Sequence, residues 1–297
     1  MPMTAPTLPT PLIDAAALAA RLAAGEATLI VDCSFELSDP AAGAAQFAEG
    51  HLPGAVHAHL DHDLAGPKHD ADGRFRGRHP LPDRAAFAAT LGRWGLRPGM
   101  ALVVYDRQGA AFAARLWWLA RWAGHEAVAV LDGGLAAWQA AGGSIEHGGL
   151  ADSTARPATS TPYPLGPATM PTLDAEAVLA LGERLTVIDA RAGERFRGEV
   201  EPLDAVAGHI PGAVNRFFKD NLGADGRFKP AESLRVDFAG LIGGRPLGQV
   251  VNQCGSGVTA CHNLLALAVA GLDGSRLYPG SWSEWCSDPA RPVATGG

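Results

Sequence analysis

The sequence predicts an α/β protein made of two tandem copies of one domain, each a mainly parallel β-sheet flanked by helices. The main observation is internal similarity, because residues 103–138 match residues 250–285 at a constant offset of 147. A second match pairs the hexapeptide at 51–56 (HLPGAV) with the one at 209–214 (HIPGAV). A repeat of this length indicates a duplicated domain rather than a solenoid of short units.

Each copy alternates short β-branched runs with helix-like segments. The runs at 29–32 and 186–189 both end in aspartate and correspond to each other in the two copies. Apolar runs separated by helical segments are typical of a parallel sheet covered on both faces. We therefore expect domains over 1–147 and 172–297, joined by a surface linker over 148–171 that is rich in Pro, Thr, Ser, Ala and Gly.

Composition narrows the class of protein. The formal charge of −7 argues against nucleic-acid partners. No apolar run reaches the roughly 20 residues of a membrane-spanning helix, and no secretory signal is visible, so we expect no membrane partner. The cysteines form neither a disulfide framework nor a zinc pattern, which favours a cytoplasmic location; they are Cys33, Cys254, Cys261 and Cys286.

The most informative stretch is a loop with the sequence CGSGVT at 254–259. It follows a strand-like run at 248–253 and precedes a helix-like run at 259–270, with Gly271 as the expected stop. A glycine-containing loop that enters a helix can turn its amide N–H groups around an anion, and the helix dipole adds positive charge. Such a cradle stabilises a thiolate, so we predict that Cys254 is an activated sulfur nucleophile.

Three other interpretations of this loop are weaker. A packed core cysteine would need no glycines around it. The spacing of Gly255, Gly257 and Ala260 fits a loose dinucleotide-binding pattern, but that pattern belongs to the first strand–helix turn of a fold. A cysteine phosphatase needs an arginine where Ala260 stands. At the constant offset Arg107 stands opposite Cys254, which indicates an exposed loop in both copies and a thiol in the second copy alone.

Beyond this loop, the chain resembles the two-domain rhodanese family of sulfurtransferases over nearly its whole length. The matching motifs are GHIPGA at 208–213, VLDGG at 130–134 and YPGSWSEW at 278–285. The resemblance implies tandem duplicated rhodanese-like domains with an inactive N-terminal copy and no metal or other cofactor. It also implies a ping-pong reaction, in which the cysteine takes a sulfane sulfur as a persulfide and an acceptor removes it.

Two branches of the family differ in the residues after the cysteine. The mercaptopyruvate branch has a loop like the one here, whereas the thiosulfate branch usually has a basic pair. We therefore expect 3-mercaptopyruvate as donor and a thiol, thioredoxin-like or cyanide acceptor, with thiosulfate as the first alternative donor. A rival of another class is a persulfide carrier that turns over poorly without its protein partner.

The resemblance also implies roles for individual residues. Ser256 supplies a hydroxyl for the leaving enolate, and Asp61 matches the aspartate of the branch, with Asp63 as a second candidate. The loop amides form the anion cradle, and their residues are Gly255, Gly257, Val258 and Thr259. Histidines 57, 59, 62, 69 and 79 crowd one region, but their spacing fits no zinc pattern, so we interpret them as cleft or surface residues.

Arginine side chains are expected to bind the anionic end of the donor. Arg195 matches the family arginine that holds the donor's charged end. The branch usually has a second arginine after a Glu-Pro pair, but Leu203 stands there in this chain. Arg216, or the basic segment 74–79, is expected to compensate for that missing half of the clamp.

Overall fold

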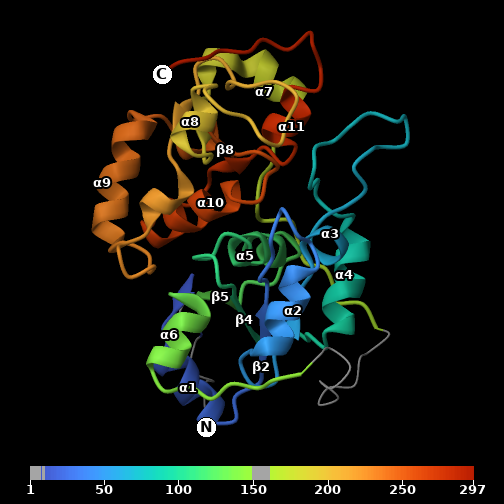
Figure 1. The fold of residues 1–297 in the computed structure, drawn as a ribbon, viewed down its shortest axis with the longest axis vertical. Helices are drawn as coiled ribbons and strands as arrows, with labels where there is room; N and C mark the ends of the chain where they lie inside the picture. The colour runs from blue at the N-terminus through green and yellow to red at the C-terminus, as the bar shows by residue number, and fades with distance from the viewer. Residues whose placement is uncertain (1–7, 9–10, 149–160) are drawn as a thin grey trace. The chain divides into compact units, whose positions relative to one another are not determined.

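The computed structural model describes residues 8, 11–148 and 161–297 (Figure 1). It contains two compact units that do not follow chain order. Unit 1 is Met1–His59 with Arg84–Pro167, and unit 2 is Leu60–Asp83 with Ala168–Gly297. A stretch from the first half of the chain is thus part of unit 2. The expected linker lies partly at 149–160, outside the described residues, so the domain limits given above stay a prediction.

Unit 1 contains a five-stranded parallel sheet in the order β1-β5-β4-β2-β3. Its strands are β1 (Leu12–Ile13), β2 (Thr28–Asp32), β3 (Val56–His57), β4 (Ala101–Tyr105) and β5 (Val128–Leu131). Its helices are α1 (Ala15–Ala23), α2 (Ala42–Glu49), α4 (Arg84–Arg93), α5 (Ala113–Trp122) and α6 (Gly134–Ala140).

Unit 2 contains a four-stranded parallel sheet in the order β7-β6-β8-β9. Its strands are β6 (Thr186–Asp189), β7 (Val214–Asn215), β8 (Val250–Gln253) and β9 (Arg276–Leu277). Its α-helices are α3 (Leu60–Asp63), α7 (Ala175–Leu181), α8 (Gly193–Phe196), α9 (Ala231–Ile242), α10 (Ala260–Val269) and α11 (Ser281–Trp285). Its 3-10 turns are η1 (Gly182–Arg184), η2 (Phe218–Asn221) and η3 (Leu247–Gln249).

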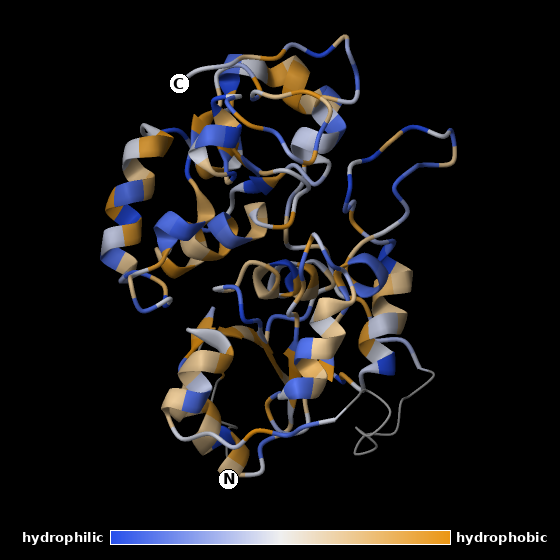
Figure 2. Ribbon diagram, in the orientation of Figure 1, coloured by the Kyte–Doolittle hydropathy of each residue, from blue (hydrophilic) through white to orange (hydrophobic). Residues whose placement is uncertain are grey.

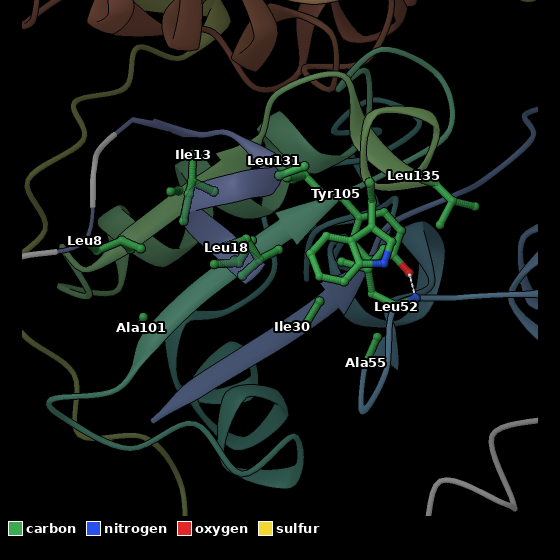
Figure 3. Packing of buried hydrophobic residues seen from close by; sticks show 14 of the residues in the cluster. Leu8, Ile13, Leu18, Ile30, Leu52, Ala55, Ala101, Tyr105, Leu131 and Leu135 are labelled. Carbon is green, nitrogen blue, oxygen red and sulfur yellow. Dashed lines mark hydrogen bonds between the residues drawn. The ribbon is translucent and has the colours of Figure 1, made fainter. Parts of the chain in front are cut away.

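The central strands are buried because helices pack against the sheets. All five residues of β2 and of β4 are buried, and these strands are among the most hydrophobic parts of unit 1 (Figure 2). One face of the unit 1 sheet packs against α1, α2 and α6 (Figure 3). In unit 2, α7 and α11 cover one face and α9 and α10 the other. The expected α/β class is therefore confirmed.

The duplication extends to single contacts. His51 stacks on Phe47 with ring centroids 3.7 Å apart, and its Nδ1 lies 2.8 Å from the Phe47 carbonyl oxygen. In unit 2, His209 stacks on Phe196 at 3.9 Å and lies 2.8 Å from the Phe196 carbonyl oxygen. These histidines begin the two matching hexapeptides, so that motif has the same packing role in both units.

The sheet register corrects one sequence-based alignment. Tyr105 pairs with Asp32, and Gln253 pairs with Asp189. Because the two aspartates are equivalent, Asp106 and not Arg107 stands opposite Cys254. The following helices, which start at residues 113 and 260, keep the offset of 147, so the unit 1 loop is one residue longer. The similar apolar strands match at either register and conceal that insertion.

We predict that Phe47→Ala lowers the free energy of unfolding by about 3 to 5 kcal/mol, the usual range for a large aromatic side chain in a core. Phe47 is fully buried and would leave a cavity beside His51. Chemical denaturation followed by circular dichroism measures the change. Leu37→Ala is the control, because Leu37 is 50% exposed and should cost under about 0.5 kcal/mol. Equal losses in the two variants would contradict the prediction.

Candidate active site

Cys254 lies at the C-terminal end of β8, in the loop that enters α10. Its side chain is 2% exposed, so the cysteine is buried and not on an exposed loop as the sequence suggested. Its backbone N–H donates to the Ser281 hydroxyl at 3.2 Å, and its carbonyl accepts from the Trp282 N–H at 3.0 Å. Gly257 has a φ of +75°, and a Cβ there would overlap the Pro279 carbonyl oxygen. The loop therefore passes so close to Pro279 that position 257 requires glycine.

The equivalent loop of unit 1 reveals what this geometry binds. Each oxygen of the Asp106 carboxylate accepts two backbone N–H groups, at distances of 2.8 to 2.9 Å. The donors are Gln108, Ala110, Phe112 and Ala113. Burial raises the pKa of Asp106 above its ordinary value, although the four N–H donors act to lower it. A loop between a parallel strand and a helix thus holds a carboxyl group here, at the position that Cys254 takes in unit 2.

Arg107 is turned away from that loop. Its guanidinium donates to the carbonyl oxygens of Gln46 and Gly50 at the end of α2. Unit 1 therefore has a carboxylate where unit 2 has a thiol, and the amide cradle of unit 1 is already filled.

Beside Cys254, unit 2 contains a line of three polar side chains. His79 Nδ1 lies 2.8 Å from Ser256 Oγ, and His79 Nε2 lies 3.2 Å from Asp61 Oδ1. Ser256 and His79 are both buried. When His79 Nε2–H donates to Asp61, Nδ1 can accept a hydrogen bond from the Ser256 hydroxyl, and when both ring nitrogens are protonated Nδ1–H donates to Ser256, so a proton can pass between serine and histidine.

His79 is the functional candidate that the sequence analysis missed. Its position next to Arg78 and before Pro80 gave no signal beyond a crowded histidine region. Ser256 and Asp61 are brought together through it, although 195 residues separate them in the chain, from 61 to 256. Asp63, the second candidate, is two positions further along α3.

Two arginines flank the residue after the cysteine. A Cβ placed on Gly255 would lie 2.7 Å from Arg78 Nη2 and 3.6 Å from both terminal nitrogens of Arg195. Both guanidiniums also pair with the buried Asp204 carboxylate, Arg195 at 3.5 Å. Gly255 therefore leaves room for two cations next to the loop, and Arg78 occupies the place that a longer side chain would fill.

Buried acids hold these arginines in place. Arg195 Nη2 lies 2.6 Å from Glu201 Oε1. Burial would raise the pKa of Glu201, but the hydrogen bonds from Arg195 and the Leu203 N–H lower it below its usual range. Arg191, which the sequence analysis did not single out, is buried against Asp189 and Glu201. Burial lowers the pKa of Arg191, yet these acids and Cys254 raise it, so a permanent cation lies near the sulfur.

The remaining candidates lie as follows. Arg216 pairs with Asp237 at 2.8 Å and donates to Asn221 at 3.0 Å, so its guanidinium is already engaged. Val258 is buried in the loop, and Thr259 is the N-cap residue of α10 without a capping side-chain bond. Cys261 is fully buried, as expected for a core residue.

Comparison with known proteins agrees with this geometry. The model of the rhodanese-like domain matches residues 14–141 and again 174–288, so the chain belongs to the rhodanese family. It is 51% identical to a probable 3-mercaptopyruvate sulfurtransferase from Pseudomonas aeruginosa, over 96% of this chain and 98% of that protein. It is 45% identical to a putative thiosulfate sulfurtransferase, SseB, from Mycobacterium tuberculosis, over 96% and 97% of the two chains. The solved 3-mercaptopyruvate sulfurtransferase of Leishmania major superposes with a TM-score of 0.80 at 29% identity, covering 97% of this chain and 76% of that one.

We predict that Asp106→Ala lowers the free energy of unfolding by about 3 kcal/mol, because four buried N–H groups lose their acceptor. Thermal and denaturant unfolding measure the change. Asp72→Ala is the control, since the Asp72 side chain is 73% exposed. An Asp106→Ala variant as stable as the parent would mean that the amide cradle of unit 1 does not depend on an anion.

Proposed function

We propose that this protein is a sulfurtransferase that moves a sulfane sulfur from 3-mercaptopyruvate to a thiol or cyanide acceptor, through a persulfide on Cys254. The observation that carries the proposal is the contact of Ser256 with His79, and of His79 with Asp61, at the Cys254 loop. Relatives named as 3-mercaptopyruvate sulfurtransferases support this donor.

The first half-reaction is an attack by the Cys254 thiolate on the sulfur of the donor. An S–S bond forms, the C–S bond breaks, and the electron pair leaves as the enolate of pyruvate. Protonation of that enolate completes the step. In the second half-reaction an acceptor thiolate or cyanide takes the outer sulfur, and the Cys254 thiolate is regenerated.

The two ends of the donor need different groups. The developing enolate requires a proton donor. Ser256 can give its hydroxyl proton to the enolate and recover one from Nδ1–H of a protonated His79, whose charge Asp61 stabilises. The carboxylate of the donor requires a cationic fork, which Arg195 and Arg78 can provide beside Gly255. Arg78 thereby serves as the second carboxylate-binding arginine, at whose usual position this chain has Leu203. The basic segment 74–79, which contains Arg78, was expected to compensate in this way.

The loop amides are the proposed cradle for the thiolate and the persulfide. The analogous amides of unit 1 bind the Asp106 carboxylate, which supports an anion-binding role for the loop at 254–259. Its residues include Gly255, Gly257, Val258 and Thr259. An outer persulfide sulfur also carries negative charge and gains from the same donors.

Thiosulfate is the alternative donor. The two arginines beside Gly255 could bind a dianion without a basic pair in the loop itself. The relative named as a putative thiosulfate sulfurtransferase also favours this alternative. A persulfide carrier that needs a protein partner, such as a thioredoxin-like thiol protein, would share the nucleophile but give little turnover with cyanide.

We place the reaction in the cytoplasm, where reducing conditions keep a catalytic thiol available. Cys254 is a thiol with no disulfide partner among the described residues. Among the described residues, no helix is both long enough and apolar enough to cross a membrane.

We predict that kcat/KM for 3-mercaptopyruvate exceeds that for thiosulfate by at least about tenfold, equivalent to about 1.4 kcal/mol in transition-state binding. The two donors are compared side by side with cyanide as the common acceptor. Cys254→Ser is expected to abolish turnover with both donors, whereas Cys286→Ser should not. A preference for thiosulfate would overturn the donor assignment, and turnover by Cys254→Ser would overturn the nucleophile.

We predict that Arg78→Ala raises KM for 3-mercaptopyruvate by about tenfold or more, because one arm of the carboxylate fork is lost. Initial rates over a range of donor concentrations give KM and kcat separately. Arg74→Ala removes the same charge from an exposed position on the same segment and is the matched control. Arg216→Ala tests the other candidate. A larger KM effect in Arg216→Ala than in Arg78→Ala would return the role to Arg216.

A further inference from the structure

The two halves of the chain share a hairpin that lies outside the Cys254 loop. The pentapeptide ADGRF occurs at 71–75 and again at 224–228, an offset of 153. The hairpins also match in their backbone bonds. Arg76 N–H donates to Lys68 and Lys229 N–H to Asn221, at 2.8 and 2.9 Å. The isolated bridges at 69–75 and 222–228 are likewise equivalent.

The two copies differ in length immediately after this hairpin. The next helices, α4 and α9, start at residues 84 and 231, an offset of 147. The offset falls from 153 to 147, so the first copy has 153 − 147 = 6 additional residues between hairpin and helix. These residues are 77–82, with the sequence GRHPLP. They include Arg78 and His79, the two groups that reach the Cys254 loop from the first half of the chain.

We propose that this six-residue insertion, here called the arm (residues 77–82), completes the active site of unit 2. We further propose that Gly77, Ser283 and Glu284 are positioning residues that fix the arm on segment 280–284. The inference rests on the proposed function only for the consequence that loss of these contacts impairs sulfur transfer. The arm itself is defined by the duplication and by its contacts.

The first of these contacts depends on a glycine. Gly77 has a φ of +98°, and a Cβ there would lie 2.7 Å from the Gly280 carbonyl oxygen and 3.1 Å from Ser283 Oγ. Real Cβ atoms do not approach backbone this closely, so any other residue would push the arm away from segment 280–284. The arm is thus in close backbone contact at the residue directly before Arg78.

The second contact links the arm to the cysteine loop. Arg78 N–H donates to Ser283 Oγ at 3.1 Å, and this hydroxyl donates to the Gly280 carbonyl oxygen at 3.1 Å. Ser283 N–H in turn donates to the Gly255 carbonyl oxygen at 3.0 Å. One buried serine therefore holds both the arm, through its side chain, and the residue after Cys254, through its backbone. That arrangement fixes Arg78 and His79 relative to the loop they serve.

The third contact is an ion pair made by Arg76, the residue directly before the arm. Arg76 Nε lies 3.5 Å from Glu284 Oε1, and the Glu284 side chain is 5% exposed. Burial raises the pKa of Glu284, while Arg76 and Tyr278 act to lower it. Three contacts within a few residues thus restrict the position of the arm. Their loss should matter, because a displacement of about 1 Å in a positioned group can reduce a rate by about a hundredfold.

The test compares two glycine-to-alanine variants on the same segment. Gly77→Ala introduces the clash, whereas Gly73→Ala is the matched control. Gly73 also has a positive φ, +78°, but a Cβ there has nothing within 4 Å. We expect kcat/KM for 3-mercaptopyruvate to fall about a hundredfold in Gly77→Ala and to change by less than about threefold in Gly73→Ala. Equal effects in the two variants would overturn the proposal.

A second readout does not depend on sulfur transfer. The alkylation rate of Cys254 is measured with anionic iodoacetate and neutral iodoacetamide, and the modified peptide is identified by mass spectrometry. Arg78 next to the loop should favour the anion, so the ratio of the two rates should fall about fivefold in Gly77→Ala but not in Gly73→Ala. A ratio unchanged in Gly77→Ala would mean that the arm does not place Arg78 at the site.

Two further results separate the possible failures. If the parent protein transfers no sulfur but the alkylation ratio still changes in Gly77→Ala, the proposed function is wrong and the arm stands. If Gly77→Ala does not fold, Ser283→Ala decides, because it removes the acceptor of Arg78 N–H without a clash. Ser283→Ala is expected to lower the alkylation ratio about threefold, and no change would overturn the proposal.

Discussion

The structure depends on one constraint, namely that the amide N–H groups where a parallel strand runs into a helix need an acceptor. In unit 1 the constraint is met internally, since Asp106 accepts four of these groups. In unit 2 the equivalent residue is Cys254, and no carboxylate is built in at that position. Equivalent strand-to-helix loops, one residue longer in unit 1, therefore form a closed, structural loop in unit 1 and the proposed thiolate cradle in unit 2.

The two halves of the sequence contribute different residues to the proposed site. The second half supplies the sulfur and the loop, whereas the first half supplies Arg78 and His79 on a short insertion after a hairpin that both halves share. Unit 2 includes that part of the first half, residues 60–83, within its own compact fold. Under the proposed function, the first half of the sequence lacks the nucleophile but still contributes side chains to the site.

The arginines around the proposed donor site are paired with buried acids. Arg195 and Arg78 share Asp204, and Arg195 and Arg191 share Glu201. Cations this close to a buried sulfur would repel each other if no acids lay between them. The acids also restrict the rotamers of the arginines, so less side-chain entropy is lost when a donor carboxylate binds. Leu203 is compatible with this arrangement, because the second cation comes from Arg78.

The sequence by itself determined the α/β class, the duplication and the Cys254 loop, since each follows from local motifs or repeated patterns. Its resemblance to the rhodanese family supplied the candidates Ser256, Asp61 and Arg195. It misaligned the first-copy loop by one residue, because two apolar strands match at either register and only the sheet pairing of Tyr105 distinguishes them. The tertiary structure alone decided that His79 joins Ser256 to Asp61 and that Arg78, rather than Arg216, lies beside Gly255. Side chains far apart in the sequence meet through the path of the arm, and that path depends on long-range contacts such as Gly77 against Gly280, which leave no periodic or local signal in the chain.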